Sequence, residues 1–78
     1  MIPRALPKLM TDAARNGWDV HVEHDLAGVD ARFARGHTLV NLGWIVWADE
    51  TRLDVAEING SPTPYTQCTR LIRAEETP

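Results

Sequence analysis

The chain has 78 residues, of which 44% are hydrophobic, and this predicts one small folded domain over residues 1–78 rather than a disordered segment. The formal net charge of −3 weighs against a partner that is bound through its phosphates. Cys68 is the only cysteine, which excludes an internal disulfide and a cysteine-rich zinc site, and no apolar run reaches the roughly 18 residues of a membrane helix. We therefore expect a cytoplasmic protein without membrane contact.

The first predicted element is a helix over residues 3–16. Apolar side chains recur here at the i, i+3, i+4, i+7 spacing that places them on one helical face, namely Leu6, Leu9, Met10, Ala13 and Ala14. Asn16-Gly17 then supplies a stop, because glycine adopts the left-handed conformation that ends many helices.

After Gly17 the hydrophobic period changes to two, which is typical of a half-buried strand. Trp18, Val20 and Val22 alternate with polar residues, and a second alternating run covers residues 29–35. Whether this second run forms a strand of its own stays open. Without it, the order of elements becomes α-β-β-β-α.

The two runs predict an antiparallel hairpin with Ala27-Gly28 as its two-residue loop. In that register Val22 lies opposite Phe33 and Glu23 lies opposite Arg32, which pairs apolar with apolar and acid with base.

A third strand is predicted over residues 39–48 and a fourth over residues 52–58, joined by a turn at residues 49–51. Thr63 can cap a last helix, whose apolar stripe consists of Tyr65, Cys68, Leu71 and Ile72. The tail, residues 75–78, is expected to be frayed. The order predicts an α+β domain with an N-terminal helix, a three- or four-stranded antiparallel meander sheet and a C-terminal helix.

The segment HVEHD, residues 21–25, has the composition of a metal or catalytic site. On a strand, however, His21 and Glu23 share one face and His24 points the other way, so the three do not converge on a metal ion. His37 could join His21 and Glu23 only if its turn folds back over the sheet. We expect no metal and no cofactor.

Catalysis by His24 would require a nucleophile beside it. Cys68 and the loop with Ser61 and Thr63 are the only candidates, and nothing in the sequence places them near His24. The chain also contains none of the GxSxG, P-loop, GxGxxG or HExxH motifs. These observations predict that the protein is not an enzyme and has no catalytic residues.

The third predicted strand, LVNLGWIVWA, is apolar on both faces, because Trp44 falls on one face and Ile45 and Trp47 fall on the other. If both helices cover one sheet face, the opposite face exposes an apolar patch suited to a partner. If the helices cover opposite faces, the strand is simply buried. Which tryptophan faces the core stays open, because the register of the following hairpin is ambiguous.

From this strand we predict a protein-interaction module that binds a protein or self-associates. The expected contact residues are the anchors Trp44 or Trp47 with Ile45, and the acids Asp49 and Glu50 that bias the choice of partner.

Three segments carry a resemblance to a known group: an Ala-rich first helix that ends in NGWDVHV, a late hairpin IVWADETRLDVAEING, and a closing helix entered through SPTPYTQCTRLIR. In element order and in the placement of aromatic residues, turns and arginines, the chain resembles short uncharacterised accessory proteins of actinobacterial phages. This resemblance implies a protein partner in the host cytoplasm and assigns no functional residue.

The α-β-β-β-α order also resembles the double-stranded-RNA-binding domain. That family opens its last helix with a Lys-rich run that binds phosphate, whereas this chain has TPYTQCTR there. Nucleic-acid binding is therefore the alternative function, and it would depend on the cations Arg4, Lys8, Arg70 and Arg73.

Overall fold

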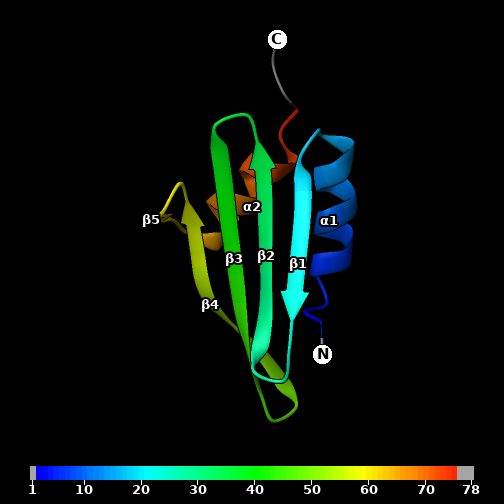
Figure 1. Cartoon of the computed structure of the whole chain (residues 1–78), viewed down its shortest axis with the longest axis vertical. Coiled ribbons are helices and arrows are strands. Elements are labelled where there is room, and N and C mark those ends of the chain that lie inside the picture. Colours follow the sequence, from blue (N-terminus) through cyan, green and yellow to red (C-terminus); the bar gives the residue numbers. More distant parts are fainter. Residues whose placement is uncertain (1, 76–78) are drawn as a thin grey trace.

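The computed structural model of the chain describes residues 2–75 (Figure 1). In chain order its elements are α1 (Leu6–Arg15), β1 (Asp19–His24), β2 (Gly28–Arg35), β3 (Thr38–Trp47), β4 (Glu50–Ile58), β5 (Ser61–Pro62) and α2 (Tyr65–Arg73). No helix in this part of the chain is long and apolar enough to cross a membrane. A frayed tail is predicted for residues 75–78, and residues 76–78 of it lie outside the described residues.

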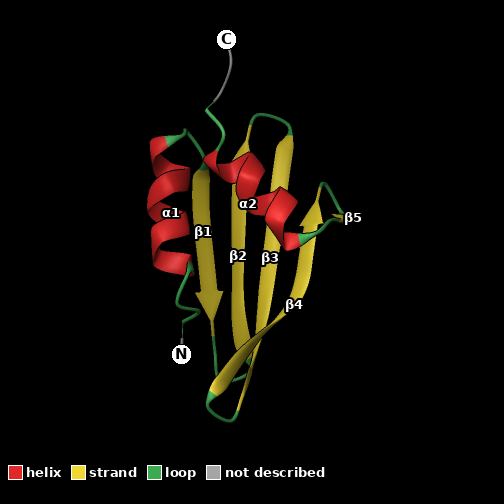
Figure 2. Ribbon diagram, turned by 180° about the vertical axis from the view of Figure 1, so that it is seen from behind, coloured by secondary structure: helices red, strands yellow, loops and turns green. Residues whose placement is uncertain are grey.

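Strands β1 to β5 form one antiparallel sheet in their sequence order, so that each strand lies beside the next along the chain. Both α1 and α2 cover the same face of this sheet (Figure 1, Figure 2). The predicted α+β domain with an antiparallel meander is confirmed. The second alternating run is the separate strand β2, so the three-stranded alternative is wrong, and the short strand β5 is an element that was not predicted.

The core lies between α1 and α2 and the sheet face beneath them. Each long central strand contributes every second residue to it, as the two-residue period of a strand requires. Because these positions share one face, the alternative with helices on opposite faces is wrong. The buried apolar side chains are Leu6, Leu9, Ala13, Trp18, Val29, Ala31, Phe33, Val40, Leu42, Trp44, Cys68 and Ile72.

Helix α1 is shorter than predicted, because the chain before it forms a turn in which the Leu6 N–H donates to the Pro3 carbonyl over 3.0 Å. Pro7 fits the first helical turn, where a missing N–H costs nothing. At the other end, the Asn16 side-chain amide donates to the carbonyls of Ile72 and Arg73 at 3.3 and 3.0 Å. This contact joins the ends of α1 and α2.

The register of the β1–β2 hairpin differs from the prediction: Glu23 lies opposite Asp30, and Arg32 lies opposite His21. The cause is the Asp25 carboxylate, which accepts the N–H groups of residues 27 and 28 at 2.8 and 3.1 Å and so places the loop at residues 26–27. Gly28 then passes so close to β3 that a Cβ there would lie 2.2 Å from the Trp44 carbonyl oxygen. A displacement of two residues keeps each β1 side chain on its predicted face.

The β3–β4 hairpin turns at residues 48–49, so Glu50 belongs to β4 and not to the predicted turn. The register shifts between Gly43 and Trp44, because Val55 lies opposite Gly43 whereas Leu53 lies opposite Trp44. Asp54 is therefore the extra residue of a β-bulge. The end of this hairpin projects beyond both helices (Figure 2), and it carries the candidate site.

Candidate protein-binding site

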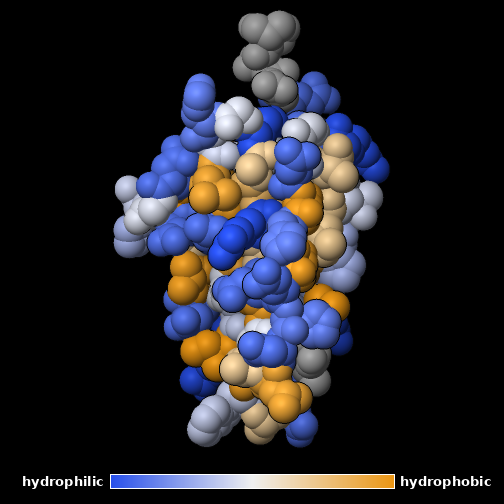
Figure 3. Space-filling model, in the orientation of Figure 1, coloured by the Kyte–Doolittle hydropathy of each residue, from blue (hydrophilic) through white to orange (hydrophobic). Residues whose placement is uncertain are grey.

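The sheet face turned away from α1 and α2, the outer face, is uncovered. In Figure 3, which views this face, hydrophilic side chains cross its centre and hydrophobic ones lie around them and toward the end with the β3–β4 hairpin. Ile45 and Trp47 of β3 lie on this face, opposite Arg52 and Glu50 of β4. We call Ile45 and Trp47 the Trp47 patch.

The two tryptophans of β3 have opposite environments because their positions differ by an odd number of residues. Trp44 is 8% exposed, and its ring packs edge-on against Tyr65 of α2 with 6.4 Å between the centroids. Trp47 is 68% exposed and Ile45 is 43% exposed. Of the predicted contact residues, Trp44 is therefore a core residue, whereas Trp47 and Ile45 are open to solvent.

The predicted acids flank the Trp47 patch. Asp49 lies in the hairpin turn and Glu50 at the start of β4, and both are exposed. Glu50 Oε2 lies 3.9 Å from Arg52 Nε, an exposed ion pair that adds little to stability. The carboxylates of Asp49 and Glu50 therefore remain available at the rim of the patch.

Toward the centre of the outer face, Gly43 adds no side chain above the backbone of β3. A Cβ at this position would lie 3.0 Å from Asp30 Oδ1 and 3.4 Å from the Val55 Cβ. Val55, which lies opposite Gly43, is itself exposed. It extends the apolar surface from the Trp47 patch toward the middle of the sheet.

The histidine segment lies on β1, at one edge of the outer face. His21 Nε2 and Glu23 Oε1 lie 3.0 Å apart, and this hydrogen bond lowers the pKa of the Glu23 carboxyl below its ordinary value of 4.5. Two strands away on the same face, the Asn41 amide of β3 donates to Glu57 Oε1 of β4 over 3.3 Å. The first of these hydrogen bonds is exposed and the second is part-buried.

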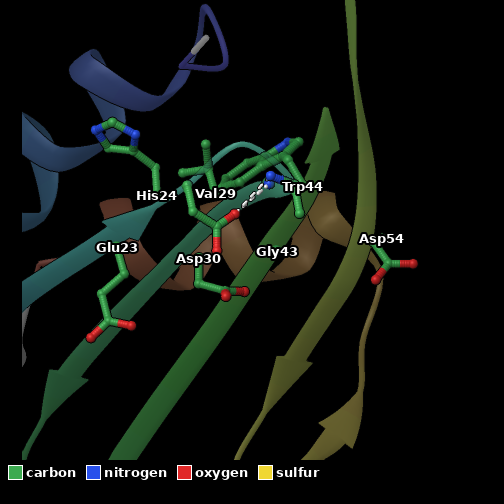
Figure 4. A pocket seen from close by; sticks show the side chains of 10 residues that line it. Glu23, His24, Val29, Asp30, Gly43, Trp44 and Asp54 are labelled. Atoms are coloured by element: carbon green, nitrogen blue, oxygen red, sulfur yellow. Dashed lines mark hydrogen bonds between the residues drawn. The ribbon is translucent and has the colours of Figure 1, made fainter. Parts of the chain in front are cut away.

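A hollow of about 580 Å³ lies where β1, β2, β3 and β4 come together, and its polar lining is mostly acidic. In Figure 4, Glu23 and Asp30 project from one side of the sheet and Asp54 points away from both, so the three do not converge; His24 projects to the other side with Trp44. Among residues 2–75, no three His, Cys, Asp or Glu side chains are placed to hold one metal ion.

Cys68, the candidate nucleophile, is fully buried in the core beneath α2. Burial raises the pKa of its thiol, and its Sγ lies 3.8 Å from the Thr63 carbonyl oxygen. A protonated, inaccessible thiol is a packing group. This agrees with the place of Cys68 in the predicted apolar stripe of the last helix.

The cations of the alternative nucleic-acid site all lie on the helical side of the molecule. Arg4 precedes α1, Lys8 belongs to α1, and Arg70 and Arg73 belong to the last turn of α2; all four are exposed. Arg73 Nε pairs with Asp12 Oδ2 at 3.1 Å, which offsets part of this positive charge.

One contact that was not predicted joins the two helix ends to the sheet. The Arg35 guanidinium lies 4.4 Å from the centroid of the Trp18 ring and donates to the carbonyls of Asn16 and Ala74 at 2.9 and 3.2 Å. These partners are distant in sequence, so no local pattern indicates them.

Comparison of the chain with protein-family models, with curated proteins and with solved structures gives no match.

Proposed function

We propose that this protein is a non-enzymatic protein-binding module that contacts its partner through the Trp47 patch. The observation that carries this proposal is the position of Trp47, a large aromatic side chain with 68% of its surface in water on a sheet face that neither helix covers. Exposed tryptophan is among the residue types that most often anchor protein interfaces.

The energetic argument is the apolar area that a partner would remove from water. A tryptophan buries about 150–250 Å² when fully covered, so covering the exposed part of Trp47 contributes roughly 3 kcal/mol at about 25 cal/mol per Å². Ile45 beside it and Val55 farther along the face add to this area. Such a gain is offset in part by the loss of free motion on association, so the patch serves as the centre of a larger contact.

The charges around the patch indicate the chemistry of the partner. Asp49 and Glu50 are exposed at its rim, and Asp54 is exposed at the nearby bulge. Acids at the rim favour a partner whose own rim carries lysine or arginine, because complementary charges guide the encounter. Together with the resemblance to accessory proteins of actinobacterial phages, this favours a host protein in the cytoplasm as the partner.

The test is affinity capture from a host lysate with the wild type, with Trp47→Ala, and with Leu39→Ala as the matched control. Leu39 is an exposed apolar residue of the same strand and the same face, at the far end from the patch. We expect Trp47→Ala to lose the captured protein and Leu39→Ala to retain it, with both variants folded by circular dichroism. Equal capture by the wild type and Trp47→Ala would exclude the patch as the contact surface.

A second function is favoured by the distribution of charge. Five of the eight Lys and Arg residues belong to α1, α2 or the turn before α1, namely Arg4, Lys8, Arg15, Arg70 and Arg73. The helical side could therefore bind nucleic acid despite the negative net charge. This predicts salt-dependent retention on duplex RNA or DNA that weakens in a Lys8→Glu, Arg70→Glu variant; absence of retention at low salt would exclude it.

A further inference from the structure

Strand β1 is an open edge of the sheet. The Asp25 N–H donates to the Gly28 carbonyl across the hairpin, whereas the Trp18 N–H donates to Ala13 of α1, away from the hairpin; both distances are 3.0 Å. Backbone groups alternate in direction along an antiparallel strand. The N–H and C=O groups of Val20, Val22 and His24 therefore point away from β2, and no hydrogen bond among residues 2–75 is recorded for them.

The opposite edge of the sheet is protected. There β4 is interrupted by the bulge at Asp54, and β5 covers its last two residues, Glu57 and Ile58. Bulges and short covering strands prevent further strands from pairing with an edge. By contrast, β1 pairs regularly over all six of its residues and contains no proline, lysine or bulge. Of the two edges of the sheet, β1 is therefore the one that can pair with another strand.

We propose that β1 is a homodimerisation edge, where a second copy of this chain pairs its own β1 antiparallel about a two-fold axis at Val22. Val22 then faces Val22 of the second copy, and Val20 faces His24 on each side of the axis. These are the residues whose backbone groups point to the open edge, so each pair exchanges its two hydrogen bonds. The two sheets become one continuous sheet with both outer faces on the same side.

The side chains of β1 select this register over its neighbours. With the axis at Val22, His21 of each copy lies opposite Glu23 of the other on the outer face, so each Glu23 gains an imidazole beside the one 3.0 Å away in its own strand. The two adjacent registers that also align the open backbone groups place the acids Asp19 and Glu23 opposite each other, or Glu23 opposite Glu23, and like charges in direct opposition repel. In the favoured register only the end pair of Asp19 and Asp25 is alike, and Asp25 accepts two N–H groups in its own turn.

The flank of α1 above this edge is also suited to a second copy. Asp12 pairs with Arg73, so that side of α1 faces α2. Figure 2 shows α1 beside β1 on the side away from α2. On a helix, the side opposite Asp12 carries Pro7, Met10 and Ala14. The second copy therefore meets short or apolar side chains there, and the cations of α1 point elsewhere.

Two charge variants test the register. One combines His21→Lys with Glu23→Lys, and the other carries His21→Glu alone. Each places like charges opposite each other on both sides of the axis in its own homodimer, whereas a mixture of the two restores opposite charges in a heterodimer. Trp47→Ala is the control, because Trp47 lies at the far end of the β3–β4 hairpin and not on β1.

Sedimentation over a range of concentrations is the measurement. We expect the wild type and Trp47→Ala to reach twice the 8.7 kDa mass of one chain, each charge variant alone to dimerise about tenfold more weakly or not at all, and the mixture to recover the dimer. Circular dichroism confirms that the variants fold. A wild type that stays monomeric up to about 1 mM, a dimer unchanged in both charge variants, or a dimer lost in Trp47→Ala would each overturn the proposal.

Amide exchange on the wild type gives a second test that needs no variant. The N–H groups of Val20, Val22 and His24 are open in one copy and hydrogen-bonded in the dimer, so their exchange must slow as the protein concentration rises. If the mass doubles while these three amides exchange at an unchanged rate, the copies pair elsewhere and β1 is not the interface.

Discussion

The sharpest stability prediction compares Trp44→Ala with Trp47→Ala, the same substitution three residues apart on β3. Trp44 has 92% of its surface covered, which at about 200 Å² and 25 cal/mol per Å² corresponds to roughly 4–5 kcal/mol. Trp47 has about a third covered, which corresponds to roughly 1.5 kcal/mol. Trp44→Ala should therefore cost about 3 kcal/mol more than Trp47→Ala.

The assay is urea unfolding followed by far-ultraviolet circular dichroism, because each variant loses a tryptophan and fluorescence is no longer comparable. A domain of this size has a total stability of about 4–12 kcal/mol, so Trp44→Ala removes much of it. Trp44→Phe, which keeps a ring beside Tyr65, provides an intermediate point with a loss of about 1–2 kcal/mol. If Trp47→Ala destabilises the fold as much as Trp44→Ala, the assignment of the core face and the outer face is wrong.

Three further outcomes follow from local contacts. Asp25→Ala removes the acceptor for two backbone N–H groups in the first turn and should lower the free energy of unfolding by about 1–2 kcal/mol in urea, while Asp25→Asn retains most of it. His21→Ala should raise the pKa of Glu23 toward 4.5 in a carbon-detected titration. Because folding lowers this pKa, ionised Glu23 stabilises the fold at a pH above 4.5, and this contribution is lost as the pH falls through the pKa of Glu23 in the folded protein. The Cys68 thiol should react with a thiol reagent only at the rate of global unfolding, and faster reaction would show that the core beneath α2 opens locally.

The order of elements could be predicted because its signals are local. The stripe of Leu6, Leu9 and Ala13 has the helical period, and β1 and β2 alternate with the strand period, so the faces of these elements follow from the sequence. The first hairpin shows where this reasoning fails. The pairing of opposite charges favours Glu23 opposite Arg32, but the Asp25 carboxylate binds the turn backbone and places Glu23 opposite Asp30. A side-chain hydrogen bond within the turn outweighs one cross-strand ion pair.

The candidate site could be located on β3 but not resolved to one tryptophan. Trp44 and Trp47 lie on opposite faces of any regular strand, and only the position of the helices decides which face is the core. That position depends on contacts between distant segments. The Arg35 guanidinium shows this clearly, since its hydrogen bonds reach Asn16 and Ala74, 19 and 39 residues away. No periodicity or spacing marks such a contact in advance.

The two proposed surfaces lie on different parts of the sheet, and this has a consequence for binding. The Trp47 patch lies on the outer face of β3, whereas the open edge is β1. A two-fold axis through β1 leaves both outer faces on one side, so a dimer presents two Trp47 patches to the same surface. Binding at one patch then raises the effective concentration of the other, which strengthens attachment by about 10²-fold or more without any new contact.

This stronger attachment requires both the Trp47 patch and the β1 dimer, and a measurement of dissociation distinguishes the two proposals. On a surface densely coated with the captured partner, the wild type should dissociate much more slowly than the His21→Lys, Glu23→Lys variant, while at sparse coating the two should dissociate alike, because each copy retains its own Trp47 patch. Trp47→Ala should lose binding at both densities. If the charge variant dissociates faster even at sparse coating, β1 touches the partner directly, and the edge belongs to the binding surface rather than to a dimer.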